Sequence, residues 1–287
     1  MSPGRHAISG ELVGTLSRQV ASLDLEPEVL LFSSTGRPGG PPRWPEMDMM
    51  EDRAVERALV VVAHPDDADF GAAGTIASWT AAGTAVTYLL CTDGDAGGFD
   101  LAVARSEIPT IRRAEQNAAG AAVGVHDVRF LGYPDGDLRV TQDLRRDISR
   151  VIRQVRPQRM LIQSPERNWA RIPASHPDHL AAGEASINAI YPDARNPFAH
   201  VSLLRDEGLA DWRVCEVWVS GHPTPDHFLD VTDHFDAKIA ALRAHRSQTA
   251  HMPDLEGMVR GWMRTNGVRA GLADGRLAEA FMVVTIP

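Results

Sequence analysis

The chain has 287 residues, of which 44% are hydrophobic and 23% are charged, and its formal net charge is −9. This length allows one large domain or two small ones, and the negative charge argues against a nucleic-acid-binding protein, because phosphate binding needs a clustered basic surface. The sequence contains neither an apolar run of the roughly 18 residues that a membrane span needs nor a secretory signal at its N-terminus. We therefore expect a cytoplasmic protein with no membrane span.

The N-terminal part of the chain differs in composition from the rest. Residues 33–50 are rich in Pro and Gly, a composition that does not pack as a regular element. We predict an N-terminal extension over residues 1–56, partly disordered, and one compact domain over residues 57–287.

The compact part is predicted to alternate between strands and helices. Residues 57–63 form a run that is continuously apolar after Arg57 and rich in Val, which is typical of a strand buried on both faces of a parallel sheet. A helix over 71–83 and a second such strand over 85–91 complete a βαβ unit. Further helices are predicted at 112–124, 143–155, 180–191 and 233–244, and further strands at 128–131, 159–163 and 214–220. The pattern indicates an α/β fold with an open, mostly parallel, Rossmann-like sheet and helices on both faces.

Candidate catalytic residues directly follow the first predicted strand. The segment AHPDD contains His64, Asp66 and Asp67 at the carboxyl end of a strand, where open α/β sheets bind their ligands. Two adjacent carboxylates repel each other, and a divalent cation removes that repulsion. His64 and Asp67 supply nitrogen and oxygen ligands of the kind that zinc accepts.

A second group of candidate residues follows a later predicted strand. The segment SHPDH contains His176 and His179, which we expect at the same edge of the sheet. One further ligand from this segment would complete a set of three and leave the fourth position open for water, as in catalytic zinc sites. Asp66, which lies next to a ligand, is then a candidate general base. His176, as an imidazolium, could stabilise the oxyanion that forms when an amide carbonyl is attacked.

Each of these segments also has a simpler interpretation. HPDD or HPDH alone can be a turn in which Pro sets φ and Asp caps the following helix. The presence of both segments, each at a strand-to-helix turn of one sheet, favours the metal site.

In these residues the sequence resembles the PIG-L/LmbE family of zinc-dependent N-acetylglucosaminyl de-N-acetylases, whose marks are AHPDD after the first strand and HPDH in the second half. The resemblance covers roughly residues 57–250 and implies an LmbE-like deacetylase domain with one zinc ion, although other divalent metals suit the same ligands. The resemblance implies zinc binding by His64, Asp67 and His179, the general base at Asp66, and oxyanion stabilisation by His176.

Other segments resemble the family more loosely. Residues 92–98 resemble its glycine-containing loop, and Arg112 and Asp135 are implied to contact the substrate. Residues 245–248, HRSQ, resemble a recurring tail motif for which the sequence suggests no role. The alternatives are simple turns at the loop and at Asp135, and a surface ion pair between Arg112 and Glu115. Many members have Glu directly after AHPDD, where this chain has Ala68, a change that bears on substrate orientation and leaves the metal ligands intact.

The predicted function is hydrolysis of an N-acetyl or other N-acyl group from an amino-sugar-containing small molecule or glycoconjugate. One alternative is a zinc-dependent amidase that acts on thiol conjugates of the mycothiol type. Another is a non-catalytic carbohydrate- or nucleotide-binding module. The glycines at 71 and 74 lack the G-x-G-x-x-G spacing of a dinucleotide site, and an intact Asp66 argues against a pure binding protein. The sequence specifies neither the aglycone, nor the acyl length, nor the oligomeric state.

Overall fold

The structure is a computed structural model that describes residues 49–287. The predicted extension over 1–56 lies outside the described residues except for 49–56, and its extent stays a prediction. Residues 49–56 contact the sheet: the buried Arg159 donates a hydrogen bond to the carbonyl of Met50 at 2.8 Å, and Val55 is buried in the core.

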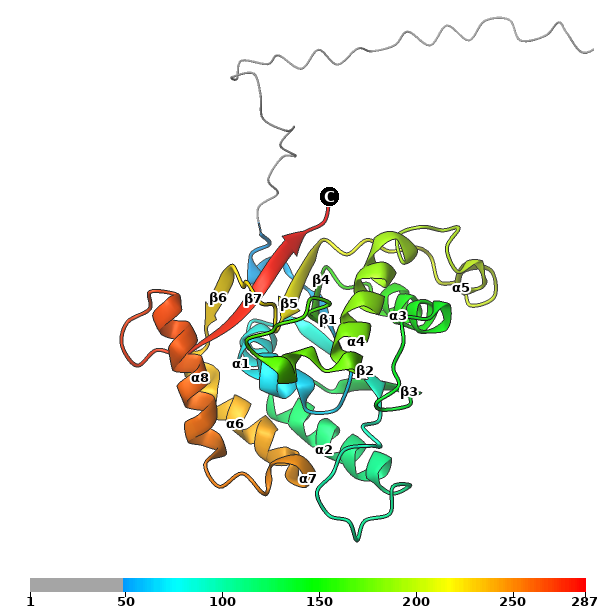
Figure 1. Cartoon of the computed structure of the whole chain (residues 1–287). Helices are drawn as coiled ribbons and strands as arrows, with labels where there is room; N and C mark the ends of the chain where they lie inside the picture. Colours follow the sequence, from blue (N-terminus) through cyan, green and yellow to red (C-terminus); the bar gives the residue numbers. More distant parts are fainter. Residues whose placement is uncertain (1–48) are drawn as a thin grey trace, which may run out of the picture. The chain divides into compact units, whose positions relative to one another are not determined.

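One sheet of seven strands runs through the described part of the chain (Figure 1). The strands are β1 (Arg57–Val62), β2 (Ala85–Thr92), β3 (Asp127–Tyr133), β4 (Arg159–Gln163), β5 (Glu216–Ser220), β6 (His227–Asp230) and β7 (Ala278–Thr285). Their order across the sheet is β3-β2-β1-β4-β5-β7-β6. The first five strands in that order pair in parallel, and β7 pairs antiparallel with both β5 and β6. The predicted open and mostly parallel sheet is confirmed, with an unpredicted antiparallel edge.

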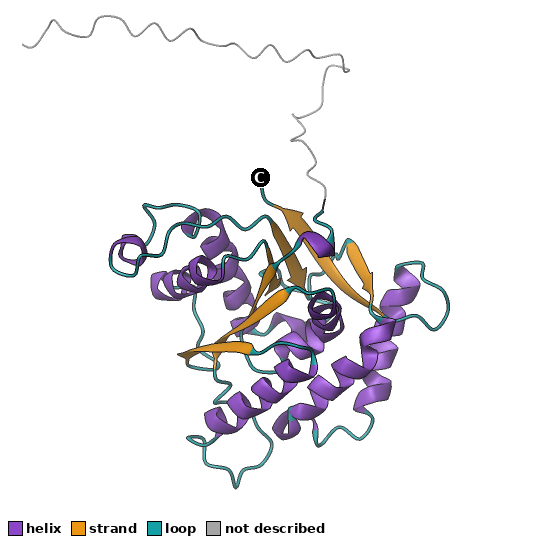
Figure 2. Cartoon of the chain, turned by 180° about the vertical axis from the view of Figure 1, so that it is seen from behind, coloured by secondary structure: helices purple, strands orange, loops and turns teal. Residues whose placement is uncertain are grey.

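Helices cover both faces of the sheet, as Figures 1 and 2 show. The α-helices are α1 (Asp67–Ala81), α2 (Ile108–Ala122), α3 (Gln142–Val155), α4 (Pro177–Asn188), α5 (Val201–Arg205), α6 (Phe235–Ala244), α7 (Arg246–Thr249) and α8 (Leu255–Arg269). Short 3-10 turns lie at Asp52–Ala54, Ile172–Ser175 and Thr232–His234, and one π-helical turn lies at Ala189–Asp193. Each helix predicted from the sequence is present, with α1 and α2 beginning four residues earlier than predicted.

The packing of strand β1 on both faces of the sheet explains its apolar sequence. Val60 and Val62 pack with α1 and α2 on one face of the sheet, whereas Leu59 and Val61 pack with α3 and α4 on the other. All four side chains are buried. Since both faces are covered, no alternation with polar residues is possible.

The strand order reverses beside β1, and this reversal determines where a ligand can bind. β2 follows β1 in the sequence and lies on one side of it, whereas β4 lies on the other side. At such a point the loops that leave the two central strands diverge and open a crevice at the carboxyl edge of the sheet. The segments after β1 and β4 are the ones that contain HPDD and HPDH.

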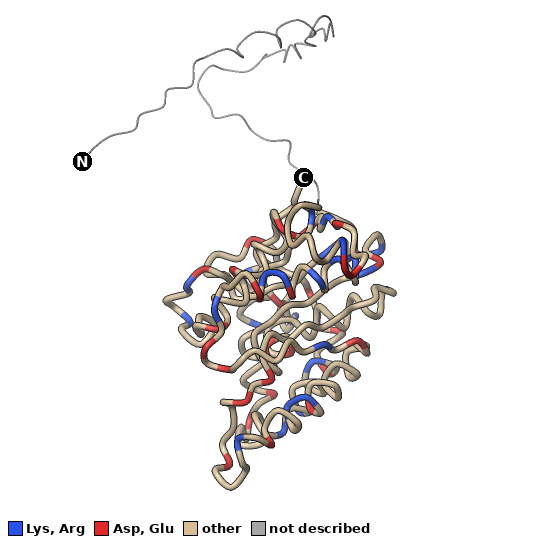
Figure 3. The backbone as a smooth tube through the Cα atoms, turned by 90° about the vertical axis from the view of Figure 1, so that its right-hand side faces the viewer, with Lys and Arg blue, Asp and Glu red and all other residues tan. Residues whose placement is uncertain are grey.

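Charged residues of both signs are interspersed along the described backbone (Figure 3). Across residues 49–287, no helix combines the length and the apolar character that a bilayer crossing requires.

Candidate active site

The turn between β1 and α1 holds Asp66 in an unusual backbone conformation. Its φ of 82° lies in the left-handed region, which costs a non-glycine residue roughly 1–2 kcal/mol. Although Asp66 is the residue that precedes α1, its carboxylate makes no capping hydrogen bond. The neighbouring Asp67 closes the turn instead, by accepting a hydrogen bond from the backbone N–H of His64 at 2.8 Å.

The three residues predicted to bind a metal are in direct contact. One carboxylate oxygen of Asp67 lies 3.2 Å from Nδ1 of His64, and the other lies 3.0 Å from Nε2 of His179. Asp67 thus bridges the turn after β1 and the start of α4. Two distant segments of the sequence meet at one point, as predicted.

A third histidine lies beside this pair. One ring nitrogen from each of His64, His176 and His179 lies within 4.8 Å of the others, and a second such group joins His64 to Asp135 and Asp178. Asp67 lies outside both groups and contacts His64 and His179 through different carboxylate oxygens. Imidazole nitrogens and carboxylate oxygens together are a donor set that suits zinc.

His64 lies at the centre of a ring of carboxylates. Its Nε2 is 3.0 Å from Asp135 Oδ1 and 3.1 Å from Asp178 Oδ2. Burial disfavours a charged ring, but hydrogen bonds to Asp135, Asp178 and Asp67 outweigh it and raise the pKa of His64 to about 12. The surrounding groups therefore favour a positive charge at this position.

Asp178 belongs to this site although its role was not predicted from the sequence. Its carboxylate is buried and accepts hydrogen bonds from the backbone N–H groups of Gly136 at 2.7 Å and Leu138 at 3.2 Å. Burial opposes ionisation, but the hydrogen bonds from His64 and Gly136 lower the pKa of Asp178 below its usual value. Asp178 thereby joins the HPDH segment to the turn that carries Asp135. Its place inside HPDH was the available signal.

His176 caps the start of α4. Its Nδ1 accepts a hydrogen bond from the backbone N–H of Asp178 at 3.2 Å, so the proton of a neutral ring lies on Nε2. Burial and the positive charges at His64 and His179 lower the pKa of His176. A neutral ring that donates from Nε2 is therefore favoured over the imidazolium considered from the sequence.

Arg112 is buried against the predicted base. Its guanidinium donates to Asp66 Oδ2 at 3.0 Å, to the Pro65 carbonyl at 2.6 Å and to the Gly94 carbonyl at 3.2 Å. A Cβ at Gly94 or Gly97 would lie 2.2 or 2.4 Å from Arg112 Nη1, so only glycine lets the loop pass this closely. The loop over 92–98 is thus a cradle for this side chain.

The alternative of a surface ion pair between Arg112 and Glu115 is wrong. Arg112 is only 4% exposed, and the Glu115 carboxylate accepts hydrogen bonds from the N–H and hydroxyl of Ser247 at 2.7 and 2.6 Å.

The charge environment of Asp66 suits a base. Burial raises the pKa of Asp66 to about 6, and the positive charge of Arg112 limits that increase. The carboxylate is therefore ionised at neutral pH while keeping an appreciable affinity for a proton.

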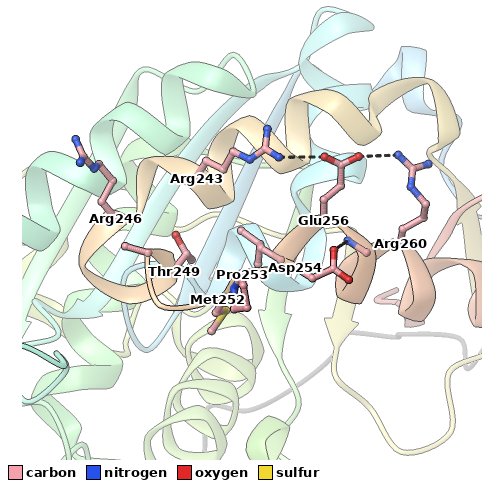
Figure 4. Close-up of a pocket in the computed structure, with 11 residues that line it drawn as sticks. Arg243, Arg246, Thr249, Met252, Pro253, Asp254, Glu256 and Arg260 are labelled. Carbon is pink, nitrogen blue, oxygen red and sulfur yellow. Dashed lines mark hydrogen bonds and ion pairs between the residues drawn. The ribbon is translucent and has the colours of Figure 1, made fainter.

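The two cavities described below lie away from the predicted site residues. One of about 590 Å³ is formed by α6, α7 and the start of α8 (Figure 4). Two arginines at its wall, Arg243 and Arg260, each bind one oxygen of Glu256, at 3.0 and 3.1 Å. A second cavity, of about 470 Å³, lies between the loop after β2 and the end of β3. None of the predicted site residues lines either cavity.

Comparison with known proteins places this arrangement in a family. The family model described as GlcNAc-PI de-N-acetylase (PIG-L) matches residues 59–190. The chain is 32% identical over 231 residues to a diacetylchitobiose deacetylase of Thermococcus kodakarensis, which covers 80% of this chain and 84% of that protein. It is 36% identical over 201 residues to a probable N-acetyl-α-D-glucosaminyl L-malate deacetylase 2 of Bacillus cereus, covering 68% of this chain and 84% of that protein.

Solved structures agree with the sequence relatives. The N,N′-diacetylchitobiose deacetylase of Pyrococcus horikoshii, solved with an inhibitor, superposes with a TM-score of 0.74 at 27% identity. The match covers 80% of this chain and 84% of that one. With its fold, its paired HPDD and HPDH segments and its relatives in agreement, the chain belongs to the PIG-L family of hydrolytic N-deacetylases.

Proposed function

We propose that the chain is a zinc-dependent hydrolase that removes the N-acetyl group from an amino-sugar glycoside or conjugate. The observation that carries this proposal is the contact of Asp67 with both His64 and His179, which joins the HPDD and HPDH segments beside Asp66. The relatives named as deacetylases of diacetylchitobiose and of an N-acetylglucosaminyl malate support an amino-sugar substrate.

His64, Asp67 and His179 would hold the metal ion, and their mixed nitrogen and oxygen donors fit zinc. When bound, the ion would polarise the acetamide carbonyl and lower the pKa of a water molecule. His176 lies beside two of these residues: the centre of its ring is 5.1 Å from that of His64 and 5.3 Å from that of His179. Because its Nδ1 accepts the backbone N–H of Asp178, its Nε2–H is the group that could act on the substrate.

Asp66 and His176 would perform the proton and charge chemistry. The Asp66 carboxylate accepts a proton from the water that attacks the acetamide carbon, and Nε2–H of His176 donates a hydrogen bond to the oxyanion that develops. Cleavage of the C–N bond then releases acetate, and the departing nitrogen takes up the proton that Asp66 accepted from the water, because a neutral His176 ring has no proton to spare. The products are acetate and a free amino sugar.

Arg112 and Asp135 would act on the substrate side. The guanidinium of Arg112 donates hydrogen bonds to Pro65, Gly94 and Asp66. These bonds support a role in holding the base, in addition to a contact with sugar hydroxyls. The Asp135 side chain is about 10% exposed and lies 3.0 Å from His64, where a sugar hydroxyl could reach it. We also propose a cytoplasmic location, consistent with a small-molecule substrate.

The experiment combines metal analysis with a substrate screen. The purified protein is analysed for zinc and incubated with diacetylchitobiose, N-acetylglucosaminyl malate and N-acetylglucosaminyl inositol, and released acetate is measured. A thiol conjugate of the mycothiol type is included, with release of its amine as the readout. We expect the purified protein to contain zinc and to release acetate from at least one of the N-acetylated amino-sugar substrates. Cleavage of the thiol conjugate alone would establish the amidase alternative instead.

Variants test the assigned roles. Asp66→Asn should keep its zinc and lose at least about 100-fold in kcat, the contribution expected of a general base. His179→Ala should lose both zinc and activity. His126→Ala, which changes an exposed histidine just before β3, is the matched control and should retain both. Full activity in Asp66→Asn would show that the base is wrongly assigned.

A further inference from the structure

We propose that His245 and Asp69 form a buried positioning pair that holds the base Asp66 in its working orientation. The inference rests on the proposed function, in which Asp66 is the base. It assigns a role to the HRSQ segment, for which the sequence suggested none. It also places a required residue well beyond the part of the chain that matches the family model, which ends at residue 190.

A chain of three hydrogen bonds connects His245 to the backbone of Asp66. Nε2 of His245 lies 2.8 Å from Oδ2 of Asp69, and the same oxygen accepts a hydrogen bond from Nε2 of Gln116 at 2.8 Å. Oε1 of Gln116 in turn accepts the backbone N–H of Asp66 at 2.8 Å. His245, Asp69 and Gln116 are each 0% exposed, so water cannot replace any of these bonds.

The backbone N–H of Asp66 determines the donor and the acceptor in each of these three hydrogen bonds. An amide N–H can only donate, so the Gln116 side chain must turn its oxygen toward Asp66 and its NH₂ group toward Asp69. Oδ2 of Asp69 is then an acceptor, and His245 presents an N–H to it from Nε2. The order of donors and acceptors is thus defined from one end to the other.

This series of hydrogen bonds ends at Asp66, where the backbone is strained. Asp66 has a φ of 82°, and a left-handed non-glycine residue persists only when its surroundings hold it. Its N–H donates to Gln116, its carboxylate accepts from the guanidinium of Arg112, and its carbonyl accepts from the backbone N–H groups of Asp69 and Phe70. Removing His245 weakens the hydrogen bond from the N–H of Asp66 to Gln116 and lets the carboxylate move relative to His64 and Asp67.

The HRSQ segment is anchored to both helices that flank the site. His245 contacts α1 through Asp69, and Ser247 binds Glu115 of α2 through its N–H and its hydroxyl, at 2.7 and 2.6 Å. Figure 1 shows α6 and α7 beside α2, consistent with their packing. The C-terminal part of the described chain thereby supports the turn that follows β1.

The test compares two substitutions of His245 using acetate release, zinc content and thermal unfolding. His245→Leu removes the donor to Asp69, and we expect kcat to fall about 10- to 100-fold, the usual effect of losing such a supporting partner. KM and zinc content should change less than about threefold, because the metal ligands are untouched. His245→Gln keeps an N–H that can reach Asp69 and should restore kcat to within about threefold of the unsubstituted protein.

A double-mutant cycle separates positioning from general loss of stability. If His245 acts through Asp66, then His245→Leu should change the residual kcat of Asp66→Asn by less than about threefold. An equal fold-loss in both backgrounds would overturn the proposal, as would an unchanged kcat in His245→Leu. A fully active Asp66→Asn would instead contradict the proposed function, so the two failures are distinguishable.

A matched control and a second variant complete the test. Arg153→Met removes a buried side chain that binds the carbonyls of Asp193 and Asn196; it should lower Tm without changing kcat at temperatures where the protein is folded. If His245→Leu does not fold, Gln116→Met breaks the same chain next to Asp66. Gln116→Met should lower kcat as much as is expected of His245→Leu, and it should leave the residual kcat of Asp66→Asn unchanged. An unchanged kcat in Gln116→Met would overturn the proposal.

Discussion

Single residues set the electrostatic balance at this site, and Arg112 shows how. Its guanidinium lies 3.0 Å from the Asp66 carboxylate, inside a space that also holds the carboxylates of Asp67, Asp135 and Asp178. Burial raises the pKa of Asp66 to about 6, and Arg112 is the largest opposing influence. Without this cation, the carboxylate of Asp66, the proposed base, would hold a proton more tightly.

Replacing Arg112 should therefore shift the pH dependence of the reaction. The base must be ionised to act, so kcat rises as pH passes the pKa of Asp66. Arg112→Met removes a positive charge, which raises that pKa and moves the acidic limb of the kcat profile to higher pH; kcat at neutral pH should fall about tenfold or more. Measured pH profiles for Arg112→Met, Arg112→Lys and Arg113→Met decide the matter.

The two other variants are controls for charge and for position. Arg112→Lys keeps the cation, so its acidic limb should stay close to that of the unsubstituted protein. Arg113 is half exposed and pairs with Asp93, so Arg113→Met should leave the profile unchanged. An acidic limb in Arg112→Met that stays in place or moves to lower pH would contradict the assignment of Asp66 as the titrating base.

The predictable residues of the site are those that lie within short motifs. His64, Asp66 and Asp67 follow a recognisable strand, and their chemistry indicates a cation. The proposed role of Gln116 and His245 could not be predicted, because it rests on contacts with α1 that span roughly 50 and 180 positions of sequence. A buried polar chain of this kind leaves no periodic pattern in the sequence.

At the scale of elements, the parallel strands were predictable and the antiparallel edge was not. The central residues of β1, β2 and β4 are uninterrupted by charge, whereas β7 carries the buried Glu279 close to its start. Glu279 pairs with Nζ of Lys238 at 2.7 Å. A charge inside a strand interrupts the apolar pattern that predicts it. The start of α1 was predicted too late because this helix begins at Asp67, inside the motif itself.

Helix α4 offers a test of how closely an element must pack to place a ligand. A Cβ on Gly183 would lie 2.4 Å from the carbonyl oxygen of Gln163 and 2.9 Å from the backbone nitrogen of Pro165. Gly183→Ala must therefore push α4 away from the end of β4, at a cost of about 1–3 kcal/mol in the free energy of unfolding. His179, one turn earlier on the same face of α4, should move with it and bind zinc more weakly.

A second glycine supplies the matched control for this prediction. Gly261 lies in the middle of α8, and nothing lies within 4 Å of a Cβ built there. Gly261→Ala should raise the free energy of unfolding by about 0.5–1 kcal/mol through its better helix propensity. Denaturant unfolding and zinc titration measure both variants. Equal stability and zinc affinity in the two would mean that the close packing of α4 does not position His179.

At the scale of the whole molecule, the site joins parts of the chain that are far apart in sequence. The turn after β1, the cradle after β2, the turn after β3 and the start of α4 all supply groups within hydrogen-bond distance of one another. Four carboxylates share this space with the guanidinium of Arg112 and three imidazoles. The described domain therefore gathers more carboxylates than fixed cations at the carboxyl edge of its sheet, and a divalent cation would neutralise part of the remaining charge.

Removing the metal should consequently destabilise the domain as a whole. A ligand that binds only the folded state adds about 2.7 kcal/mol when its free concentration is 100 times Kd, which corresponds to about 5–10 °C in Tm for a domain of this size. We expect chelation to lower Tm and added zinc to restore it, as measured by differential scanning calorimetry. His179→Ala should lose this response and His126→Ala should keep it, because only the first removes a proposed ligand, one that contacts Asp67 in the turn after β1. An undiminished response to zinc in His179→Ala would mean that the ion binds elsewhere in the protein.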